Sequence, residues 1–368
     1  MDQYRPLPKE QLSEIKDAAR LLKEGGLVVF PTETVYGIGA DARNADACRR
    51  IYEAKGRPAD NPLIVHIAAI SQLRELTGGD PPAAAVRALE LFAPGPITVV
   101  VRHNGSISPV ATTGLETVAV RIPSHPVALS LLSEAAIPVA APSANRSGRP
   151  SPTTYPMALG AMEGRVDSIL DGGPCEVGVE STILDCTTTP QRILRPGGVT
   201  LEMLIEAGFN VTGLRKPATP GPGREPGGEP RAAAAGKAAE ETAGSTDLAY
   251  RAPGSRYRHY TPEAVVHLLD EGDAEGRGSG FLESAEPRTV GLLGTAEAID
   301  SLRLSQAARA ALLETVSFES LEAYARGMFS SFYAFDQAGC RAILAILPPP
   351  EGVGVAVRDR LGRAGTPL

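Results

Sequence analysis

The feature that most limits the fold is a stretch at residues 215–244, rich in Pro, Gly, Ala and charged residues and without apolar periodicity. Such a stretch cannot bury enough apolar surface to order itself, so we interpret it as a linker. It divides the chain into an N-terminal domain (1–213), a linker and lid segment (214–262) and a C-terminal domain (263–368). A length of 368 residues also favours two domains over one core.

Apolar runs alternate with amphipathic patterns in both domains, which predicts an α/β class. In the first domain we expect helices at 11–24, 46–54, 84–92, 127–135 and 201–207. The expected strands there are 27–30, 63–65, 97–101, 118–120, 139–141, 168–170, 181–184 and 192–194. Several connections are too short for a crossover helix, which predicts a mixed sheet. In the second domain we expect strands at 264–269, 290–293 and 342–347 and a helix at 321–335.

The composition excludes several classes of protein. A net charge of −7 argues against a protein whose main task is to coat nucleic acid. No apolar run approaches the ~20 residues of a membrane span, and the first residues lack the apolar core of a signal peptide, which predicts a cytoplasmic protein without membrane contact. The four cysteines have no CxxC spacing, which favours reduced thiols over zinc or disulfides.

One segment, residues 27–66, gathers the polar groups that suit a ligand site. A buried strand leads into Pro31–Gly37, a short helix ends at Gly56, and a second apolar run delivers His66. Lys55 and Arg57 flank the glycine, and two cations near an imidazole suit an anionic, phosphate-bearing ligand. Taken alone, the same two cations equally suit a solvated helix end, whose dipole they stabilise.

Three further polar clusters follow expected strands. Thr117 and Arg121 share one face of a strand, where the arginine suits either a carboxylate ligand or a surface ion pair. Ser143 and Asn145 follow another strand and suit either a site or simple turn chemistry. A buried Arg195 would need an anionic partner from the protein or from a ligand.

Nucleotide-binding signatures such as GxxxxGK[ST] and GxGxxG are absent from the sequence, as are a His/Cys metal cluster and a GxSxG elbow. Polar clusters at several strand ends of one domain instead favour a single cavity. Without an activated nucleophile, such a cavity favours chemistry that holds two substrates together.

These stretches resemble the threonylcarbamoyl-AMP synthase family in its two-domain form, with an N-terminal YrdC-like domain. The matching segments are Pro31–Gly37, Lys55–Pro58, Asn61–His66, Thr117–Pro123, Ala141–Asn145, Gly178–Thr182, Leu194–Gly197, Ala252–Tyr260 and Gly352–Ala364. The resemblance implies a twisted mixed sheet with an open cavity, followed by a smaller Rossmann-like α/β domain. Two departures, Ser255 for the family's usual methionine and Asp359 for its usual asparagine, concern the linker and the last helix.

The resemblance also implies an activity: L-threonine, bicarbonate and ATP, with magnesium, give threonylcarbamoyl-AMP and pyrophosphate. The product would pass to the enzymes that transfer the threonylcarbamoyl group to tRNA. Threonine-binding positions would be Thr34, His66, Arg121, Ala141 and Ser181. ATP-binding positions would be Arg57, Asn61, Thr117, Ser143, Ser151 and Arg195. Apart from the resemblance, the cations and aromatics of residues 256–260 predict a lid over the nucleotide, with Tyr257 or Tyr260 over the adenine, or else a segment that docks the second domain. Lys55, Arg57 and Asn145 would be catalytic, and no protein ligand to a metal is expected.

Two alternatives remain open at this point. One is an RNA-binding or regulatory module that uses the same cationic cavity, although the acidic charge and the lack of an aromatic series disfavour more than weak RNA binding. The other is a carbamoyl-transferring maturation enzyme with a related domain. Such an enzyme would carry a zinc finger, which the cysteine spacing excludes.

Overall fold

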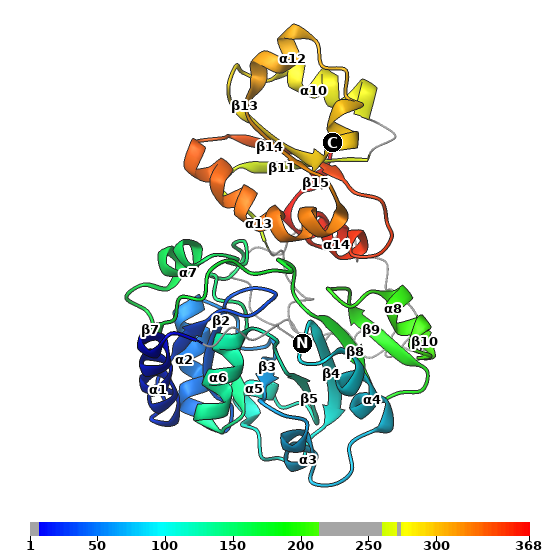
Figure 1. Ribbon diagram of the computed structural model, residues 1–368. Coiled ribbons are helices and arrows are strands. Elements are labelled where there is room, and N and C mark those ends of the chain that lie inside the picture. Colours follow the sequence, from blue (N-terminus) through cyan, green and yellow to red (C-terminus); the bar gives the residue numbers. More distant parts are fainter. Residues whose placement is uncertain (1–6, 213–259, 271–273) are drawn as a thin grey trace, which may run out of the picture.

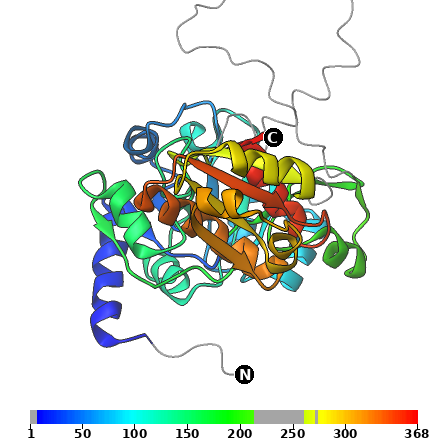
Figure 2. The ribbon, with the colours of Figure 1, turned by 90° about the horizontal axis from the view of Figure 1, so that it is seen from above.

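The computed structural model describes residues 7–212, 260–270 and 274–368. It contains two β-sheets with flanking helices, one in each of two domains that lie against each other (Figure 1). Seen from above, the second domain (yellow to red) lies over the first (blue to green) (Figure 2). The predicted α/β class is confirmed. Within these residues no helix is long and apolar enough to cross a membrane.

The first domain is built on a ten-stranded mixed sheet, in the order β10-β9-β8-β4-β5-β3-β6-β2-β1-β7. Its strands are β1 (Val28–Phe30), β2 (Gly37–Asp41), β3 (Ile64–His66), β4 (Ile97–Arg102), β5 (Thr117–Arg121), β6 (Val139–Ala140), β7 (Ser168–Ile169), β8 (Thr182–Asp185), β9 (Gln191–Arg195) and β10 (Val211–Thr212). For example, β3 pairs in parallel with β5 and antiparallel with β6. The prediction of a mixed sheet is therefore confirmed.

Helices cover this sheet and form two cores. They are α1 (Lys9–Lys23), α2 (Ala45–Lys55), α3 (Ser71–Thr77), α4 (Ala83–Phe92), α5 (Pro109–Thr112), α6 (Pro126–Ala135), α7 (Tyr155–Met162) and α8 (Leu201–Glu206). Successive residues of β1 enter different cores, as the two-residue period of a strand requires. Val28 and Phe30 pack with α1 and α6, whereas Val29 packs with α2 and α4.

The ends of α2 are fixed by local chemistry that positions the site. The Asn44 side chain accepts hydrogen bonds from the backbone N–H groups of Asp46 and Ala47, which satisfies the first turn. Gly56 ends the helix in the left-handed conformation, with φ of 59°. This cap places Lys55 in the last helical turn and releases Arg57 into the following loop.

The second domain carries a five-stranded, fully parallel sheet in the order β13-β12-β14-β11-β15. Its elements are β11 (Val265–Asp270), η2 (Ala274–Gly278), α10 (Ser279–Ser284), β12 (Val290–Thr295), α11 (Ala296–Asp300), α12 (Gln306–Ala311), β13 (Leu312–Phe318), α13 (Leu321–Ala338), β14 (Ala342–Leu347), α14 (Gly354–Ala364) and β15 (Thr366–Pro367). One face packs against α13 and α14, and the other against α10, α11 and α12. The Rossmann-like expectation is confirmed.

The two domains share a buried apolar core and are also joined by hydrogen bonds. Val35 and Val179 of the first domain belong to the same buried cluster as Phe329 on α13. Gly178 approaches α13 so closely that a Cβ there would lie 2.3 Å from the Cα of Arg326. Arg326 also donates from Nε to the carbonyl oxygen of Glu176 at 2.9 Å. The second domain is therefore packed directly against the loop that precedes β8.

Candidate active site

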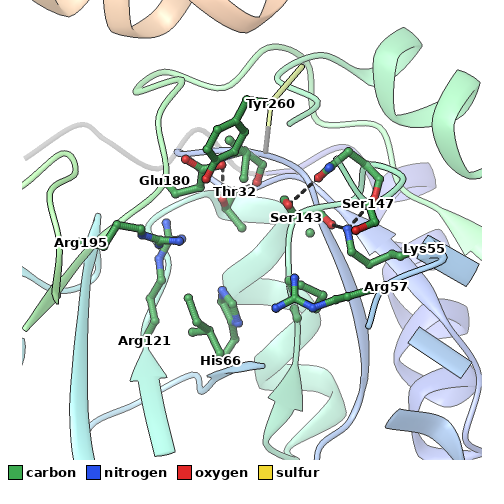
Figure 3. A pocket seen from close by; sticks show the side chains of 16 residues that line it. Thr32, Lys55, Arg57, His66, Arg121, Ser143, Ser147, Glu180, Arg195 and Tyr260 are labelled. Carbon is green, nitrogen blue, oxygen red and sulfur yellow. Dashed lines mark hydrogen bonds between the residues drawn. The ribbon is translucent and has the colours of Figure 1, made fainter. Parts of the chain in front are cut away.

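A pocket lies beside the ends of β3 and β5, facing the second domain (Figure 3). Eight of the predicted site residues line it: Lys55, Arg57, His66, Arg121, Ala141, Ser143, Asn145 and Arg195. They come from strands, loops and a helix end that are far apart in the sequence. The sheet order explains the convergence, because β3, β5 and β6 are neighbours in the centre of the sheet.

Lys55 is fully buried at the edge of the pocket. Its ammonium group donates hydrogen bonds to the backbone carbonyl oxygens of Ser143 and Asn145, so it ties the loop after β6 to α2. Burial, together with the nearby charge of Arg57, lowers the pKa of Lys55 well below its usual 10.5. Arg57 itself donates from Nη2 to the carbonyl oxygens of Asn61 and Pro62, at 3.1 and 3.2 Å.

His66 and Arg121 stand side by side, because they are partners in the parallel register of β3 and β5. Arg121 donates from Nη2 to Oε1 of Glu33 at 2.6 Å, and both side chains are buried. Within the described residues, His66 Nδ1 and Arg121 Nε are buried and have no hydrogen-bond partner. Since buried polar atoms are normally paired, these two nitrogens indicate a place where a ligand supplies the partners.

The buried imidazole gives a pH-dependent stability. Burial and then the charge of Arg121 lower the pKa of His66 from 6.5 to about 3. Between those values the unfolded chain binds a proton that the folded protein does not, so the free energy of unfolding falls as the pH falls. From pH 7 to pH 5 we expect His66 alone to cost about 2 kcal/mol, at about 1.4 kcal/mol per pH unit below 6.5.

Denaturant unfolding of the wild type and His66→Gln at both pH values checks this. The wild type should lose about 2 kcal/mol more than the variant. The other histidines are present in both proteins, so their contributions cancel. Equal pH dependence in the two proteins would show that His66 is not held neutral.

The anionic partner that a buried Arg195 requires is found within the protein. Arg195 donates from Nε to the carbonyl oxygen of Ser181 at 3.1 Å. The negative charge of the nearby Glu180 carboxylate stabilises the positively charged guanidinium of Arg195. Burial alone would raise the pKa of Glu180, yet the charges of Arg360 and Arg195 lower it from 4.5 to about 2. Glu180 therefore stays ionised in the pocket wall.

The remaining predicted residues lie around the pocket rather than on its lining. Thr34 is fully buried and shares a 2.8 Å hydrogen bond with the hydroxyl of Thr32, which does line it. Ser151 donates to Glu180 at 2.7 Å, and Ser181 bonds the hydroxyl of Thr98 at 2.7 Å.

Two predicted ATP contacts, Asn61 and Thr117, are also not among the residues that line the pocket. Asn61 presents its carbonyl oxygen to Arg57, in the loop before β3. Thr117 begins β5, four residues before Arg121, which corresponds to roughly 13 Å along a strand. Tyr257 lies outside the described residues, so its position over the adenine stays a prediction.

Sequence reasoning missed three polar lining residues: Thr32, Ser147 and Glu180. Thr32 and Glu180 lie inside Pro31–Gly37 and Gly178–Thr182, two segments that the sequence already singled out, so membership of those segments was the available signal. Tyr260, which the sequence offered beside Tyr257 as a cover for the adenine, lines the pocket and packs on Phe329 of the second domain, with ring centroids 5.1 Å apart.

The residues present do not form a magnesium site of their own. Within the described parts of the chain no three His, Cys, Asp or Glu side chains are grouped to hold a metal ion. The pocket carboxylate, Glu180, already accepts hydrogen bonds from Ser151 and Arg360. We therefore assign no step to a protein-bound metal.

Known protein families match both domains of the chain. The family described as "Telomere recombination" matches residues 20–197, and the threonylcarbamoyl-AMP synthase C-terminal domain matches residues 199–366. The threonylcarbamoyl-AMP synthase of Bacillus subtilis is 41% identical, over 95% of this chain and 92% of that protein. The enzyme of the same name from Pyrococcus abyssi is 38% identical, over 97% and 96%.

A solved structure extends the likeness to three dimensions. The crystal structure of P. abyssi Sua5 complexed with L-threonine has a TM-score of 0.77 and 35% identity, and covers 97% of this chain and 96% of that one. Both domains, in the same order, are therefore shared with these relatives. The chain belongs to the threonylcarbamoyl-AMP synthase family.

Proposed function

We propose that this enzyme condenses L-threonine, bicarbonate and ATP into threonylcarbamoyl-AMP and pyrophosphate in the pocket described above. One observation carries the assignment to this pocket: His66 and Arg121 present unpartnered buried nitrogens beside Lys55, Arg57 and Arg195. Among the described residues that line the pocket, the positive charge exceeds what the one carboxylate, Glu180, can balance, which suits a carboxylate and a triphosphate as ligands.

The reaction needs no covalent bond to the enzyme. The threonine amine attacks the carbon of bicarbonate and water leaves, which gives a carbamate. A carbamate oxygen then attacks the α-phosphorus of ATP, and the bond from that phosphorus to pyrophosphate breaks. Catalysis then rests on holding the reactants together and on stabilising negative charge as it moves to the leaving pyrophosphate.

The residues divide into two groups in this proposal. Arg121 binds the threonine carboxylate through the N–H groups that Glu33 does not use, and His66 lies beside it. Thr34, Ala141 and Ser181 shape the rest of the threonine end. Arg57, Asn61, Thr117, Ser143, Ser151, Arg195 and Tyr257 serve ATP. Lys55 and Asn145 hold the loop between the two ends through the hydrogen bond from the Lys55 ammonium.

The role of magnesium and the fate of the product are also part of the proposal. Magnesium would arrive bound to the phosphates of ATP and neutralise part of their charge. The product, a mixed anhydride, would be consumed by cytoplasmic enzymes that transfer its threonylcarbamoyl group to tRNA. The comparisons do not favour the alternative of an RNA-binding or regulatory module.

Pyrophosphate release is the direct test. The purified full-length protein should release pyrophosphate from ATP only when both threonine and bicarbonate are present. Omitting either one, in buffer freed of carbon dioxide, should reduce the rate to background. Release that ignores threonine, or that ignores bicarbonate, would contradict the proposed reaction.

Arg121 gives a sharper test of the threonine site. Arg121→Lys keeps a positive charge near Glu33 but loses the Nε donor, so we expect threonine to bind about 10-fold to 100-fold more weakly, the cost of about one charge-assisted hydrogen bond. An alanine variant is less informative, because it would leave the Glu33 carboxylate buried and unpaired.

Calorimetric titration with threonine measures this change. ATP affinity and the midpoint of thermal unfolding serve as controls, and both should stay near their wild-type values. If threonine binds Arg121→Lys as tightly as the wild type, the carboxylate lies elsewhere.

A further inference from the structure

Glu33 is a buried carboxylate whose two oxygen atoms are both used. Oε1 accepts a hydrogen bond from Nη2 of Arg121 at 2.6 Å, and Oε2 accepts one from the backbone N–H of Ser124 at 3.0 Å. Arg121 lines the candidate active site, whereas Glu33 and Ser124 line a neighbouring cavity. The carboxylate therefore supports Arg121 from behind, as seen from the pocket, and takes no place in the pocket itself.

The backbone of Glu33 is fixed as well. The Thr32 hydroxyl donates to the carbonyl oxygen of Val35 at 2.6 Å, which closes a turn around Glu33. The carbonyl oxygen of Glu33 accepts from the N–H of Val177 at 2.7 Å. The other end of that peptide group, the carbonyl oxygen before Val177, accepts from Nε of Arg326 in the second domain. Glu33 is therefore held in place independently of Arg121.

Arg121 keeps donors for a ligand. Its side chain lies in the pocket beside His66 (Figure 3). Its Nε is buried and has no hydrogen-bond partner among the residues that the structure describes. Because a guanidinium is a planar, rigid fork, the bond from Nη2 to Glu33 limits the directions that the other N–H groups can take.

We infer that Glu33 is a positioning residue, which holds the Arg121 guanidinium in the orientation that receives the substrate carboxylate. The inference rests on the proposed function, in which Arg121 binds that carboxylate. Charge alone would act in the opposite direction, because Glu33 balances Arg121 and its loss would strengthen the attraction for an anion. Orientation prevails, since a hydrogen bond weakens steeply with misalignment, whereas attraction between charges falls only gradually with distance.

Two substitutions separate orientation from charge. In Glu33→Gln the amide offers one acceptor oxygen, so its NH2 group faces either Arg121 or Ser124, both of which are donors. Glu33→Asp keeps the charge but withdraws the carboxylate from both partners by one methylene group. Orientation predicts weaker threonine binding in both variants. Charge alone predicts tighter binding by Glu33→Gln and no change in Glu33→Asp.

Calorimetric titration with L-threonine and with L-threonine amide measures recognition of the carboxylate. The two ligands share the side chain and the amine, but the amide has no carboxylate. In both variants we expect the Kd for threonine to rise about 10-fold, the cost of a weakened charge-assisted hydrogen bond, while the Kd for the amide stays within about 2-fold. A merely structural role would weaken the binding of both ligands alike.

Glu176→Gln is the matched control. Glu176 is exposed and lines the same cavity as Glu33. The substitution removes an equal negative charge but leaves the bond between Glu33 and Arg121 in place. Both affinities should therefore stay within about 2-fold of the wild type, as for other exposed charges.

The outcomes are distinct. A selective loss of threonine binding in both Glu33 variants supports the inference. Threonine binding that is unchanged or tighter in either variant overturns it, and so does an equal loss for threonine and its amide. If Glu33→Gln does not fold, Glu33→Asp decides alone by the same criteria. A wild type that releases pyrophosphate without threonine would instead refute the proposed function.

Discussion

Lys55→Met and Arg57→Met are each expected to lower the rate of pyrophosphate release by about 100-fold or more, the usual effect of removing one donor from developing negative charge. The two side chains act in different ways. Arg57 presents its guanidinium directly to the pocket, whereas the Lys55 ammonium also holds the carbonyl oxygens of Ser143 and Asn145. Loss of Lys55 therefore removes charge and loosens the loop after β6.

Arg49→Met is the matched control for both variants. Arg49 lies on the same helix, is mostly exposed and pairs with Asp46. Its loss should leave the rate within about 2-fold, since exposed ion pairs contribute little. Circular dichroism and thermal unfolding establish that each variant is folded. Near-wild-type rates for both Lys55→Met and Arg57→Met would remove the basis for placing the phosphates here.

Gly178→Ala is expected to have the largest effect on stability. Gly178 has φ of +78°, which costs an alanine about 1–2 kcal/mol. In addition, a Cβ would lie 2.3 Å from Arg326 Cα and 2.5 Å from the carbonyl oxygen of Ala325. Because these are backbone atoms of α13, relief requires the domains to move apart. We expect activity to fall with stability, since Glu180 lies two residues further along the chain.

Gly173→Ala separates the two causes. Gly173 has the same φ of +78°, but nothing lies within 4 Å of the position that its Cβ would occupy. It should lose only the conformational penalty. Denaturant unfolding should therefore place Gly178→Ala at least 2 kcal/mol below Gly173→Ala, a gap that overpacking commonly gives. Equal stability of the two variants would mean that the backbone at the domain interface shifts to accommodate the added Cβ at little cost in free energy.

Strong periodicity made much of the fold predictable. The buried face of α13 contains Met328, Phe332 and Phe335, as its helical spacing predicted. The sequence did not indicate β2, because Gly37–Asp41 is buried throughout and has no alternation of polar and apolar residues. It did not indicate β13 either, which is an edge strand with no fully buried position and with Glu314, Thr315 and Ser317 exposed.

The candidate site likewise contains residues that the sequence predicted and residues that it did not. His66 and Arg121 were predicted because each lies at the end of an apolar run, where side chains from neighbouring strands converge, and Lys55 because it precedes the glycine that ends a short helix. Their charge partners were not predicted, since pairing depends on distance in space. Glu33 lies 88 residues from Arg121, and only the folded sheet brings the two together.

The ion pair between Glu180 and Arg360 also has a consequence for folding during synthesis on the ribosome. The two residues are 180 positions apart in the chain. At about 5–20 residues per second, a ribosome needs roughly 10–40 s between the two. Until α14 emerges, the Glu180 carboxylate lacks its hydrogen bond from Arg360, whereas its partner Ser151 belongs to the first domain. Completion of the pocket is therefore a late event of biosynthesis, tied to the emergence of α14.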